Sequence, residues 1–508
     1  MKPMRSGYFI LLIIILLGSC RKDFSTILSS GELVFSRDTI FLDTVFTNIS
    51  SSTRTLKVYN RSNKDISIPT IALGRGENSF YRLNVDGIPG KTFENIPILA
   101  NDSIFIFIEA TIDFSQVVNP LYTDAILFDA ANNVQDVDLV TLVQDAIFYF
   151  PERDANRIKE TISLGLDAEG NALAINGRLL EDSELTWTAE KPHVVYDFIG
   201  VPEGKTLTIE AGAKVFFHTN SGLLVQENGS LKVMGTLDQE VVFEGDRLEP
   251  AFSDVAGQWG TIWLRSGSVA NEIDYAIIKN GIIGLLVDDM SSVIPTLTLR
   301  NTQIYNASNF GILGRSSHIV GENLVIGAAG QASLAATAGG KYDFVHSTFA
   351  NHWTGGFRQF PAVLLNNFFL TQDDNNEIVN GVHLEFANFT NCIIDGNQGV
   401  EFLADAVAGV DFNFKLTNSL LKFDTTNQEL LSNPLYDFTN TSIYENSLLN
   451  AVTDFRNPVQ NDLIIGENSQ AIGAGLLSGA LSVPFDILGV DRTSVPDIGA
   501  YQHIVFEP

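Results

Sequence analysis

Residues 301–306 have the sequence NTQIYN, and six-residue segments of the same pattern recur on both sides of them. These segments begin at Tyr275 (YAIIKN), Asn323 (NLVIGA), His346 (HSTFAN), Asn367 (NFFLTQ), Asn391 (NCIIDG), Asn418 (NSLLKF) and Asn446 (NSLLNA). From Asn301 onward, successive starts lie 21 to 28 residues apart. Short apolar strands at this period, with no helical segment between them, are typical of the coils of a right-handed parallel β-helix.

The recurring asparagine has a physical explanation in such a fold. Stacked coils place equivalent residues about 4.8 Å apart. A side-chain amide can donate to the coil on one side and accept from the coil on the other, so a ladder of asparagines satisfies its own polar groups. A leucine-rich horseshoe has a similar period, but it requires a Leu-x-x-Leu-x-Leu spacing that these segments lack.

The preceding segments extend the same pattern towards the N-terminus. Residues 204–217 and 229–236 are short apolar runs broken by glycine, and no strand alternates with a helical pattern of 10–15 residues. A doubly wound α/β fold is therefore disfavoured. We expect the β-helix, with a C-terminal closing segment, to occupy residues 185–505, preceded by a linker and cap over residues 150–184.

Residues 32–149 have a different character. Short apolar runs alternate with polar turns, and residues 103–110 read as a central strand. This pattern predicts an antiparallel β-sandwich, so the whole chain is expected to be all-β. Residues 58–60, 100–103 and 143–146 resemble the turn and closing motifs of immunoglobulin-like domains of the Hydin type. That resemblance implies a module that spaces or binds.

The N-terminus has the features of a secretion signal. Lys2 and Arg5 precede an apolar run at residues 8–17, which is too short to cross a bilayer of about 30 Å. Residues 17–20 (LGSC) follow at once and resemble the lipobox of bacterial lipoproteins. The resemblance implies cleavage after residue 19, lipid on Cys20 and a tether over residues 20–31. The alternative is an ordinary signal peptide that happens to contain a cysteine.

Composition excludes several classes of partner and site. Hydrophobic residues make up 45% of the chain and its net charge is −29, which disfavours nucleic acid as a partner because that requires a basic surface. After Cys20 only Cys392 remains, so no internal disulfide can form. The seven histidines are scattered, and we predict neither a metal site nor a cofactor.

Several further stretches resemble a family of Bacteroidota lipoproteins that contain a right-handed β-helix. They are residues 43–47 (DTVFT), 84–87 (NVDG), 243–249 (FEGDRLE), 257–260 (GQWG), 277–280 (IIKN) and 497–502 (DIGAYQ). The last resembles the closing motif of many β-helix proteins, with Gln502 in place of glutamate. The resemblance implies an outer-membrane lipoprotein, on the periplasmic face or the cell surface, and brings no established activity.

The search for a catalytic site yields only weak candidates. Polygalacturonase-type hydrolases carry Asn-Thr-Asp, Asp-Asp, Gly-His-Gly and Arg-Ile-Lys in that order. Here Arg-Ile-Lys (157–159) precedes the β-helix, Gly-His-Gly and Asn-Thr-Asp are missing, and the Asp-Asp pairs at 288–289 and 373–374 stand alone. Solvated turns explain both pairs better than catalysis, so we assign no catalytic residue.

The strongest candidate for ligand binding is the polar stretch at residues 245–259. Arg247 can bind a carboxylate or sulfate through two hydrogen bonds, Trp259 can serve as a platform for a sugar, and Asp246 and Glu249 lie beside them in the sequence. The alternative is a loop pinned by its own arginine–carboxylate pairs, with Trp259 packed as a lid.

A second cluster contains His346, His352 and Trp353. Because His346 occupies the ladder position of the repeat, it is better explained as a structural residue than as a metal ligand.

These observations leave three functional hypotheses. The favoured one is a membrane-anchored module that binds glycan or protein, or spaces other envelope components, without catalysis. The alternatives are a polysaccharide-degrading lyase or hydrolase and a purely structural envelope protein. The possible partners are a membrane, through lipid on Cys20, and polysaccharide or other envelope proteins.

Overall fold

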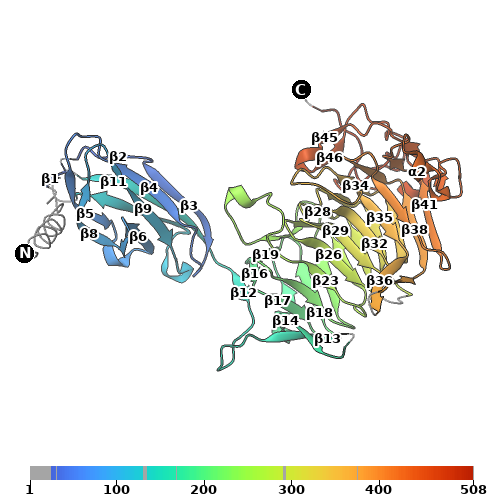
Figure 1. Cartoon of the computed structure of the whole chain (residues 1–508), viewed down its shortest axis with the longest axis horizontal. Helices are drawn as coiled ribbons and strands as arrows, with labels where there is room; N and C mark the ends of the chain where they lie inside the picture. The colour runs from blue at the N-terminus through green and yellow to red at the C-terminus, as the bar shows by residue number, and fades with distance from the viewer. Residues whose placement is uncertain are drawn as a thin grey trace, which may run out of the picture. The chain divides into compact units, whose positions relative to one another are not determined.

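The computed structural model of the chain describes residues 25–29, 31–129, 134–167, 169–289, 293–373 and 376–506. The chain divides between Asp145 and Ala146 into two compact units (Figure 1). The expected signal peptide and Cys20 lie outside the described residues.

The first unit is a β-sandwich of two sheets over a single apolar core. The larger sheet contains β1 (Ile27–Leu28), β5 (Ile66–Leu73), β10 (Leu121–Phe128), β11 (Gln135–Gln144) and β3 (Thr39–Phe46), with β8 (Thr92–Ile98) beside β5. The smaller sheet contains β2 (Val34–Phe35), β4 (Arg54–Tyr59), β9 (Ser103–Ala110), β6 (Tyr81–Val85) and β7 (Ile88–Gly90).

The strand predicted at residues 103–110 is the central strand β9. Ile104, Ile106 and Ile108 point into the core, whereas Phe105 and Phe107 are exposed on the other face. Because side chains alternate along a strand, this sequence covers one face only and needs a second sheet opposite it. The alternation therefore explains the sandwich.

The second unit contains three long sheets, to which successive coils contribute one strand each (Figure 1). Their strands pair in parallel, except that residues 161–166 and 172–179 at the start of sheet 2 pair antiparallel. Sheet 1 contains β12 (Ile147–Tyr149), β16 (His193–Val195), β19 (Lys214–Phe217), β22 (Val241–Gly245), β25 (Ala276–Lys279), β28 (Gln303–Tyr305), β31 (Val325–Gly327), β34 (Thr348–Asn351), β39 (Ile393–Gly396), β42 (Leu420–Leu421) and β44 (Leu448–Leu449).

Sheet 2 contains β13 (Thr161–Leu166), β14 (Ala172–Leu179), β17 (Phe198–Val201), β20 (Gly222–Val225), β23 (Ile262–Leu264), β26 (Ile283–Asp288), β29 (Phe310–Arg315), β32 (Ala332–Thr337), β35 (Val363–Asn366) and β40 (Phe402–Asp405). Sheet 3 contains β15 (Thr186–Trp187), β18 (Thr206–Glu210), β21 (Ser230–Met234), β24 (Asn271–Asp274), β27 (Leu297–Arg300), β30 (His318–Glu322), β33 (Gly340–Val345), β38 (Leu384–Thr390), β41 (Phe412–Thr417) and β43 (Tyr444–Glu445). The predicted fold class, an all-β chain with a sandwich followed by a parallel β-helix, is confirmed.

Stacks of equivalent apolar residues fill the interior of the β-helix. One stack in sheet 2 is fully buried and runs through eight strands: Ile199, Leu223, Ile262, Leu285, Ile312, Leu334, Val363 and Phe402. Each coil buries its apolar side chains against the next, which is why no single coil is stable alone.

The repeat identified in the sequence marks the turn from sheet 3 to sheet 1. The first residue of each repeat segment except the one at Asn367 has a left-handed backbone, with φ between 44° and 55°: Tyr275, Asn301, Asn323, His346, Asn391, Asn418 and Asn446. Asparagine adopts this conformation more readily than most residues. The amide of Asn323 donates to Asn301 at 2.9 Å, and that of Asn391 donates to Nε2 of His346 at 2.8 Å, so the expected ladder forms at these two steps. The amide of Asn418 instead donates to the carbonyl of Ala474 in the C-terminal segment at 2.9 Å.

Asn367 was predicted to start a coil, and that prediction is wrong. The ladder passes from His346 directly to Asn391, and residues after Asn367 form an antiparallel hairpin of β36 (Phe368–Asp373) and β37 (Asn376–Gly381). The segment NFFLTQ has the sequence pattern of a coil start, but the strand that it begins, β36, pairs with β37 of the same hairpin.

The start of the sandwich and the start of the β-helix both lie closer to the N-terminus than expected, because a short strand before each expected boundary already pairs with the unit that follows it. β1, within the expected tether, pairs with β5 of the sandwich. β12, within the range expected for the sandwich, pairs with β16 of the β-helix.

The C-terminal segment packs against the outer face of sheet 1. It includes β45 (Phe455–Asn457), the short 3₁₀ turn η6 (Pro458–Gln460) and β46 (Asp462–Ile465). The closing motif docks on the ladder turn, because the backbone N–H of Gly499 donates to the carbonyl of Asn391 at 2.8 Å and that of Ala500 donates to Oγ1 of Thr348 at 3.1 Å. This segment becomes one wall of the site described below.

Candidate functional site

The ring of Trp259 lies in the core of the β-helix. It is fully buried, stacks on Phe217 with ring centroids 4.3 Å apart, and donates from Nε1 to the carbonyl of Lys279 at 2.9 Å. A ring with no exposed face cannot stack on a sugar, so the interpretation of Trp259 as a binding platform is corrected here.

Arg247 is engaged within its own loop. Its guanidinium lies 3.3 Å from the carboxylate of Glu249 and 3.7 Å from the ring centre of Phe252. These contacts correspond to the alternative in which the loop is pinned by its own arginine–carboxylate pair.

Asp246 belongs to a polar row that crosses three coils. Register places Tyr196, His218 and Asp246 at equivalent positions just after β16, β19 and β22. His218 stacks on Tyr196 at 4.5 Å, and its Nδ1 lies 2.8 Å from Oδ2 of Asp246. Burial raises the pKa of Asp246, and the contact with His218 opposes that shift.

Tyr196 and His218 of this row line a cavity of about 730 Å³, and Lys159 and Asp197 line it as well. Nζ of Lys159 lies 2.6 Å from Oδ2 of Asp197, so the one lysine in the lining is already neutralised. The cavity therefore offers an aromatic and imidazole stack without a free cation.

The pair Asp288 and Asp289 does not form an acid/base arrangement. Asp288 accepts from Arg315 at 2.5 Å and from Nε1 of Trp263 at 2.8 Å, and the buried Asp289 accepts from the hydroxyl of Thr296. Asp374 and the side chain of Asp373 lie outside what the structure describes.

A second cavity, of about 540 Å³, brings together parts of the chain that the sequence separates widely; we call it the turn pocket. Its lining comes from the loop before Trp259, from the ends of β28, β31 and β34, and from η6: Asp254, Ala256, Asn306, Ala328, His352, Trp353, Thr354, Gly355, Val459, Gln460 and Asn461. Two of the three residues in the predicted histidine–tryptophan cluster, His352 and Trp353, therefore line one cavity. His346 instead lies buried in the ladder.

The indole of Trp353 is partly exposed at this pocket. A Cβ added at Gly355 would lie 2.5 Å from Cζ2 of the indole, so only glycine fits beside the ring in this position. The backbone carbonyl of Trp353 accepts from the side-chain amide of Asn397 at 2.7 Å, which fixes the start of this loop.

The imidazole of His352 is uncharged at neutral pH. Burial lowers its pKa, with the Asp395 carboxylate opposing and the Lys422 and Arg358 cations adding to the shift. The Nε2 atom is buried and has no hydrogen-bond partner within the described residues. A buried polar atom without a partner is uncommon in folded proteins.

Amides complete the lining of the turn pocket. Asn306, Gln460 and Asn461 carry both donors and acceptors, Asp254 adds one carboxylate, and no lysine or arginine is among the described lining residues. Among these four residues, only Asp254 was indicated by the sequence, as part of the stretch at residues 245–259. The sequence around Gln460 and Asn461 gives no indication that η6 packs beside Asn306.

The described part of the chain contains neither a candidate metal cluster nor a candidate membrane-spanning helix. No group of three or more histidine, cysteine, aspartate or glutamate side chains there could hold a metal ion. Within the same residues, no helix is long and apolar enough to span a bilayer. The buried thiol of Cys392 has its pKa raised to about 12 by burial, which makes it unreactive.

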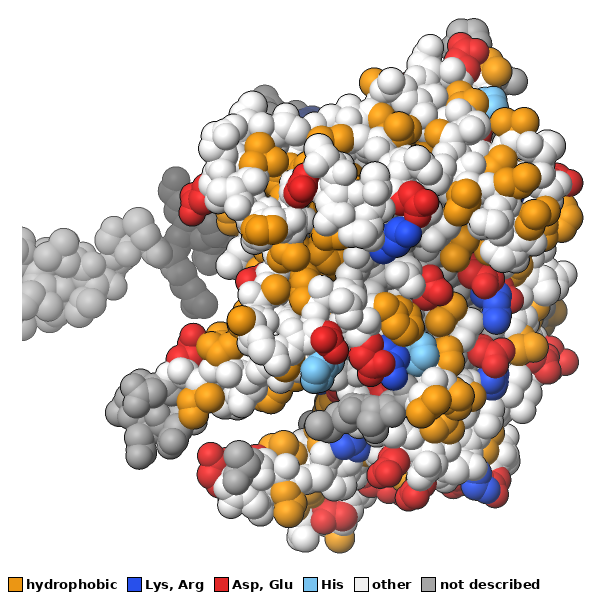
Figure 2. All heavy atoms as spheres, turned by 90° about the vertical axis from the view of Figure 1, so that its right-hand side faces the viewer, with side chains coloured by type: hydrophobic (Ala, Val, Ile, Leu, Met, Phe, Trp, Pro, Cys, Tyr) orange, Lys and Arg blue, Asp and Glu red, His pale blue; other side chains and the backbone are white. Residues whose placement is uncertain are grey.

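Figure 2 shows acidic and basic side chains lying beside one another on the face at the right of Figure 1. Two pairs on sheet 3 have this character, with Lys341 3.1 Å from Glu385 and Lys415 2.7 Å from Glu445. Exposed pairs of this kind contribute little to stability, but they neutralise the basic side chains of the surface.

Comparison with known proteins gives no family. No family model matches the chain, and no curated protein matches it. A similar solved structure is a family 123 glycoside hydrolase from Clostridium perfringens that hydrolyses glycolipid glycans, with 11% identity and a TM-score of 0.17. The alignment covers 23% of this chain and 26% of that one, so the likeness carries no argument about function.

Proposed function

We propose that the chain is a glycan-binding protein of the bacterial envelope, and that the turn pocket holds a neutral oligosaccharide. The lining of this pocket carries the proposal: a partly exposed indole, a neutral imidazole and three side-chain amides converge on one cavity. Concave sites with an apolar ring and a few convergent polar groups are the usual form of small-ligand sites.

The chemistry of the lining selects the class of glycan. Sugar hydroxyls need paired donors and acceptors, which amides and a neutral imidazole supply. A uronic acid or sulfated sugar would need a cation, whereas Asp254 and the net charge of −29 repel it. A neutral saccharide is therefore the better fit.

Binding without turnover is favoured over polysaccharide degradation. Hydrolysis with inversion needs two carboxyl groups about 6.5–9.5 Å apart with room for water. Among the described lining residues of the turn pocket, Asp254 alone carries a carboxylate. Asp288 and Asp289 are engaged by Arg315 and Thr296.

Anchoring at the membrane is part of the same proposal. Lipid on Cys20 would hold the sandwich and the β-helix at a membrane surface, where a rigid glycan-binding module reaches polysaccharide. The Cys20→Ser variant should leave the membrane fraction in detergent phase partitioning. Unchanged partitioning would contradict the lipid anchor but would not affect the proposal that the turn pocket binds a glycan.

The function is tested by a glycan array probed with the full mature protein, followed by assays for reducing ends and unsaturated products on every ligand found. We expect binding to neutral oligosaccharides without product. Trp353→Ala should abolish the signal, whereas Phe357→Ala should retain it, because Phe357 lies in the same loop but is exposed and outside the pocket. Turnover of a bound glycan would replace this proposal with the enzymatic one.

A further inference from the structure

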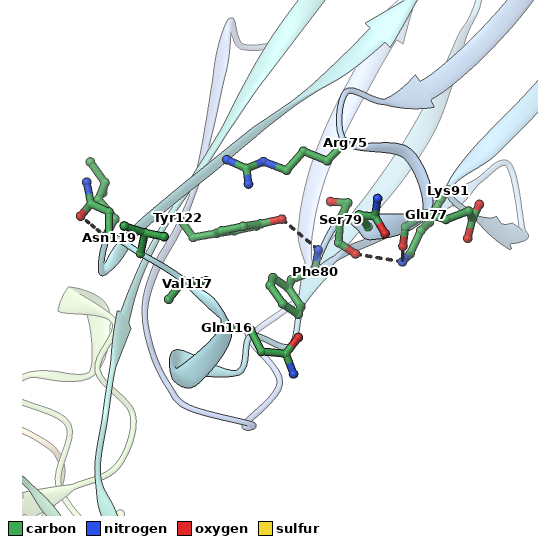
Figure 3. Close-up of a pocket in the computed structure, with 12 residues that line it drawn as sticks. Arg75, Glu77, Ser79, Phe80, Lys91, Gln116, Val117, Asn119 and Tyr122 are labelled. Carbon is green, nitrogen blue, oxygen red and sulfur yellow. Dashed lines mark hydrogen bonds between the residues drawn. The ribbon is translucent and has the colours of Figure 1, made fainter.

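The β-sandwich carries its own cavity, of about 730 Å³, which we call the sandwich pocket (Figure 3). It lies among the loop after β5, Lys91 in front of β8, and the segment that leads into β10. Nothing in the proposed function uses it.

The guanidinium of Arg75 is available to a ligand. It lies over the ring of Tyr122, 4.8 Å from the ring centre, as Figure 3 shows. No side-chain acceptor for it is found in the described part of the chain. The nearby carboxylate of Asp124 instead accepts from the backbone N–H groups of Arg75 and Ala125 at 3.1 and 2.8 Å.

Arg75 has no carboxylate partner among the described residues, a feature that it shares with some other arginines such as Arg61. Many of the other arginines form ion pairs: Arg54 with Asp43, Arg82 with Glu109, Arg178 with Glu184, Arg247 with Glu249, Arg315 with Asp288, Arg358 with Glu401 and Arg456 with Asp462. Arg75 lines a cavity and has no such pair, so its charge faces the space where a ligand would lie.

A second cation lies in the same lining. Nζ of Lys91 donates to the carbonyls of Glu77 and Ser79 at 2.7 and 2.8 Å, which fixes its position and leaves one N–H free. The carboxylate of Glu77 is the acidic group of the lining, and its side chain is exposed to solvent. The cavity thus keeps a positive character in a chain with a net charge of −29.

Aliphatic side chains border these cations on the other side. Val118 is fully exposed and Leu121 is 48% exposed, and both line the pocket with Val117. Exposed aliphatic side chains next to an unpaired guanidinium suit a ligand that combines a carboxylate with an aliphatic group.

The state of Tyr122 favours a peptide over an acidic sugar. Sugars bind proteins through the open face of an aromatic ring, but Arg75 covers this ring, and Phe80 meets it edge-on with centroids 5.3 Å apart. The Tyr122 hydroxyl accepts the backbone N–H of Phe80 at 3.1 Å. No free aromatic face is therefore left for a sugar at this ring.

We propose that the sandwich pocket binds an acidic peptide segment of a partner protein. Arg75 receives an aspartate, glutamate or C-terminal carboxylate through two parallel hydrogen bonds, Lys91 adds a third, and an adjacent aliphatic side chain of the peptide packs on Val118 and Leu121. The sandwich then recruits a protein while the β-helix engages a glycan.

An array of twelve-residue peptides tests the proposal with the full mature protein. Each peptide alternates Asp or Glu with Leu or Val, and a matched peptide replaces the acids by Asn or Gln. We expect binding of the acidic members only, weakened by added salt. Affinities of the strongest members are then measured by fluorescence polarisation.

Variants assign that binding to the pocket. Arg75→Gln should weaken it more than about tenfold, since a charged hydrogen-bonded pair is lost, and Val118→Ser should weaken it several-fold. Arg61→Gln is the matched control, because Arg61 also lies over a tyrosine ring, 4.3 Å from the centre of Tyr59, but outside the pocket. Circular dichroism and melting curves verify that each variant is folded.

Three results would overturn the proposal: no peptide binding tighter than about 1 mM, equal binding of acidic and amide peptides, or unchanged affinity in folded Arg75→Gln. Oligogalacturonate binding that depends on Arg75 would also overturn it, in favour of an acidic sugar. None of these outcomes bears on Trp353 or on the neutral glycan, so the two proposals fail separately.

Discussion

The side-chain amide of Asn461 donates a hydrogen bond of 2.9 Å to the amide oxygen of Asn306, although the two residues lie 155 positions apart in the chain. Asn306 follows β28 of the β-helix, and Asn461 ends η6 with a left-handed backbone. This bond links the C-terminal segment to the coils and holds one wall of the turn pocket against the others.

Removing that hydrogen bond should lower the affinity of the turn pocket for its ligand more than it lowers the stability of the fold. Asn461→Ala loses one hydrogen bond, worth about 1 kcal/mol, and places alanine in a left-handed backbone at a cost of about 1 kcal/mol more. The wall is then free to move. We expect a several-fold loss of glycan affinity with a melting temperature within a few degrees of the unchanged protein. Asn413→Ala, which removes an exposed amide on sheet 3, is the control and should change neither quantity. Equal affinity in both variants would show that the wall does not depend on this bond.

The two tryptophans of the candidate sites should behave in opposite ways. Trp259→Ala opens a cavity in the core and removes the stacking on Phe217, so the free energy of unfolding of the β-helix should fall by about 3–5 kcal/mol. Trp353→Ala removes a partly exposed ring and should cost about 1 kcal/mol. Denaturation followed by circular dichroism measures both values, and similar losses would refute the distinction between a core ring and a ligand-binding ring.

The ladder residue His346 makes stability depend on pH. Burial, with Arg492 nearby, lowers its pKa to about 3, so the folded state keeps it neutral. Because the unfolded chain takes up a proton below about pH 6.5, the stability that neutral His346 contributes is present above that pH and is lost as the pH falls towards 3.

His346→Asn should remove this dependence, since asparagine occupies the same position in neighbouring coils. Between pH 6.5 and pH 4, the free energy of unfolding of the unchanged protein should fall relative to the variant by about 1.4 kcal/mol per pH unit. Urea denaturation at a series of pH values gives both curves. Parallel curves would mean that His346 is protonated in the folded state.

The period of the repeat and the asparagine ladder could be read from the sequence because both depend on local conformation. A left-handed turn residue begins each of the seven segments that form coils, and asparagine tolerates that backbone. The same reasoning failed at Asn367, where an identical local pattern precedes a hairpin.

The turn pocket could be predicted only in part. His352 and Trp353 are adjacent in the sequence and were recognised as a pair, but the wall that Asn461 supplies depends on how the C-terminal segment docks on sheet 1. The sequence does not distinguish the buried ring of Trp259 from the partly exposed ring of Trp353, because glycines lie beside both. That distinction requires the stacking on Phe217.

The central claim is that the turn pocket binds a neutral oligosaccharide through Trp353, and equilibrium titration of the strongest glycan-array ligand against three proteins tests it most directly. Isothermal titration of the unchanged protein should give one site per chain, Trp353→Ala should weaken binding by more than about tenfold, and Phe357→Ala should match the unchanged protein. Equal affinity for all three folded proteins would contradict the claim.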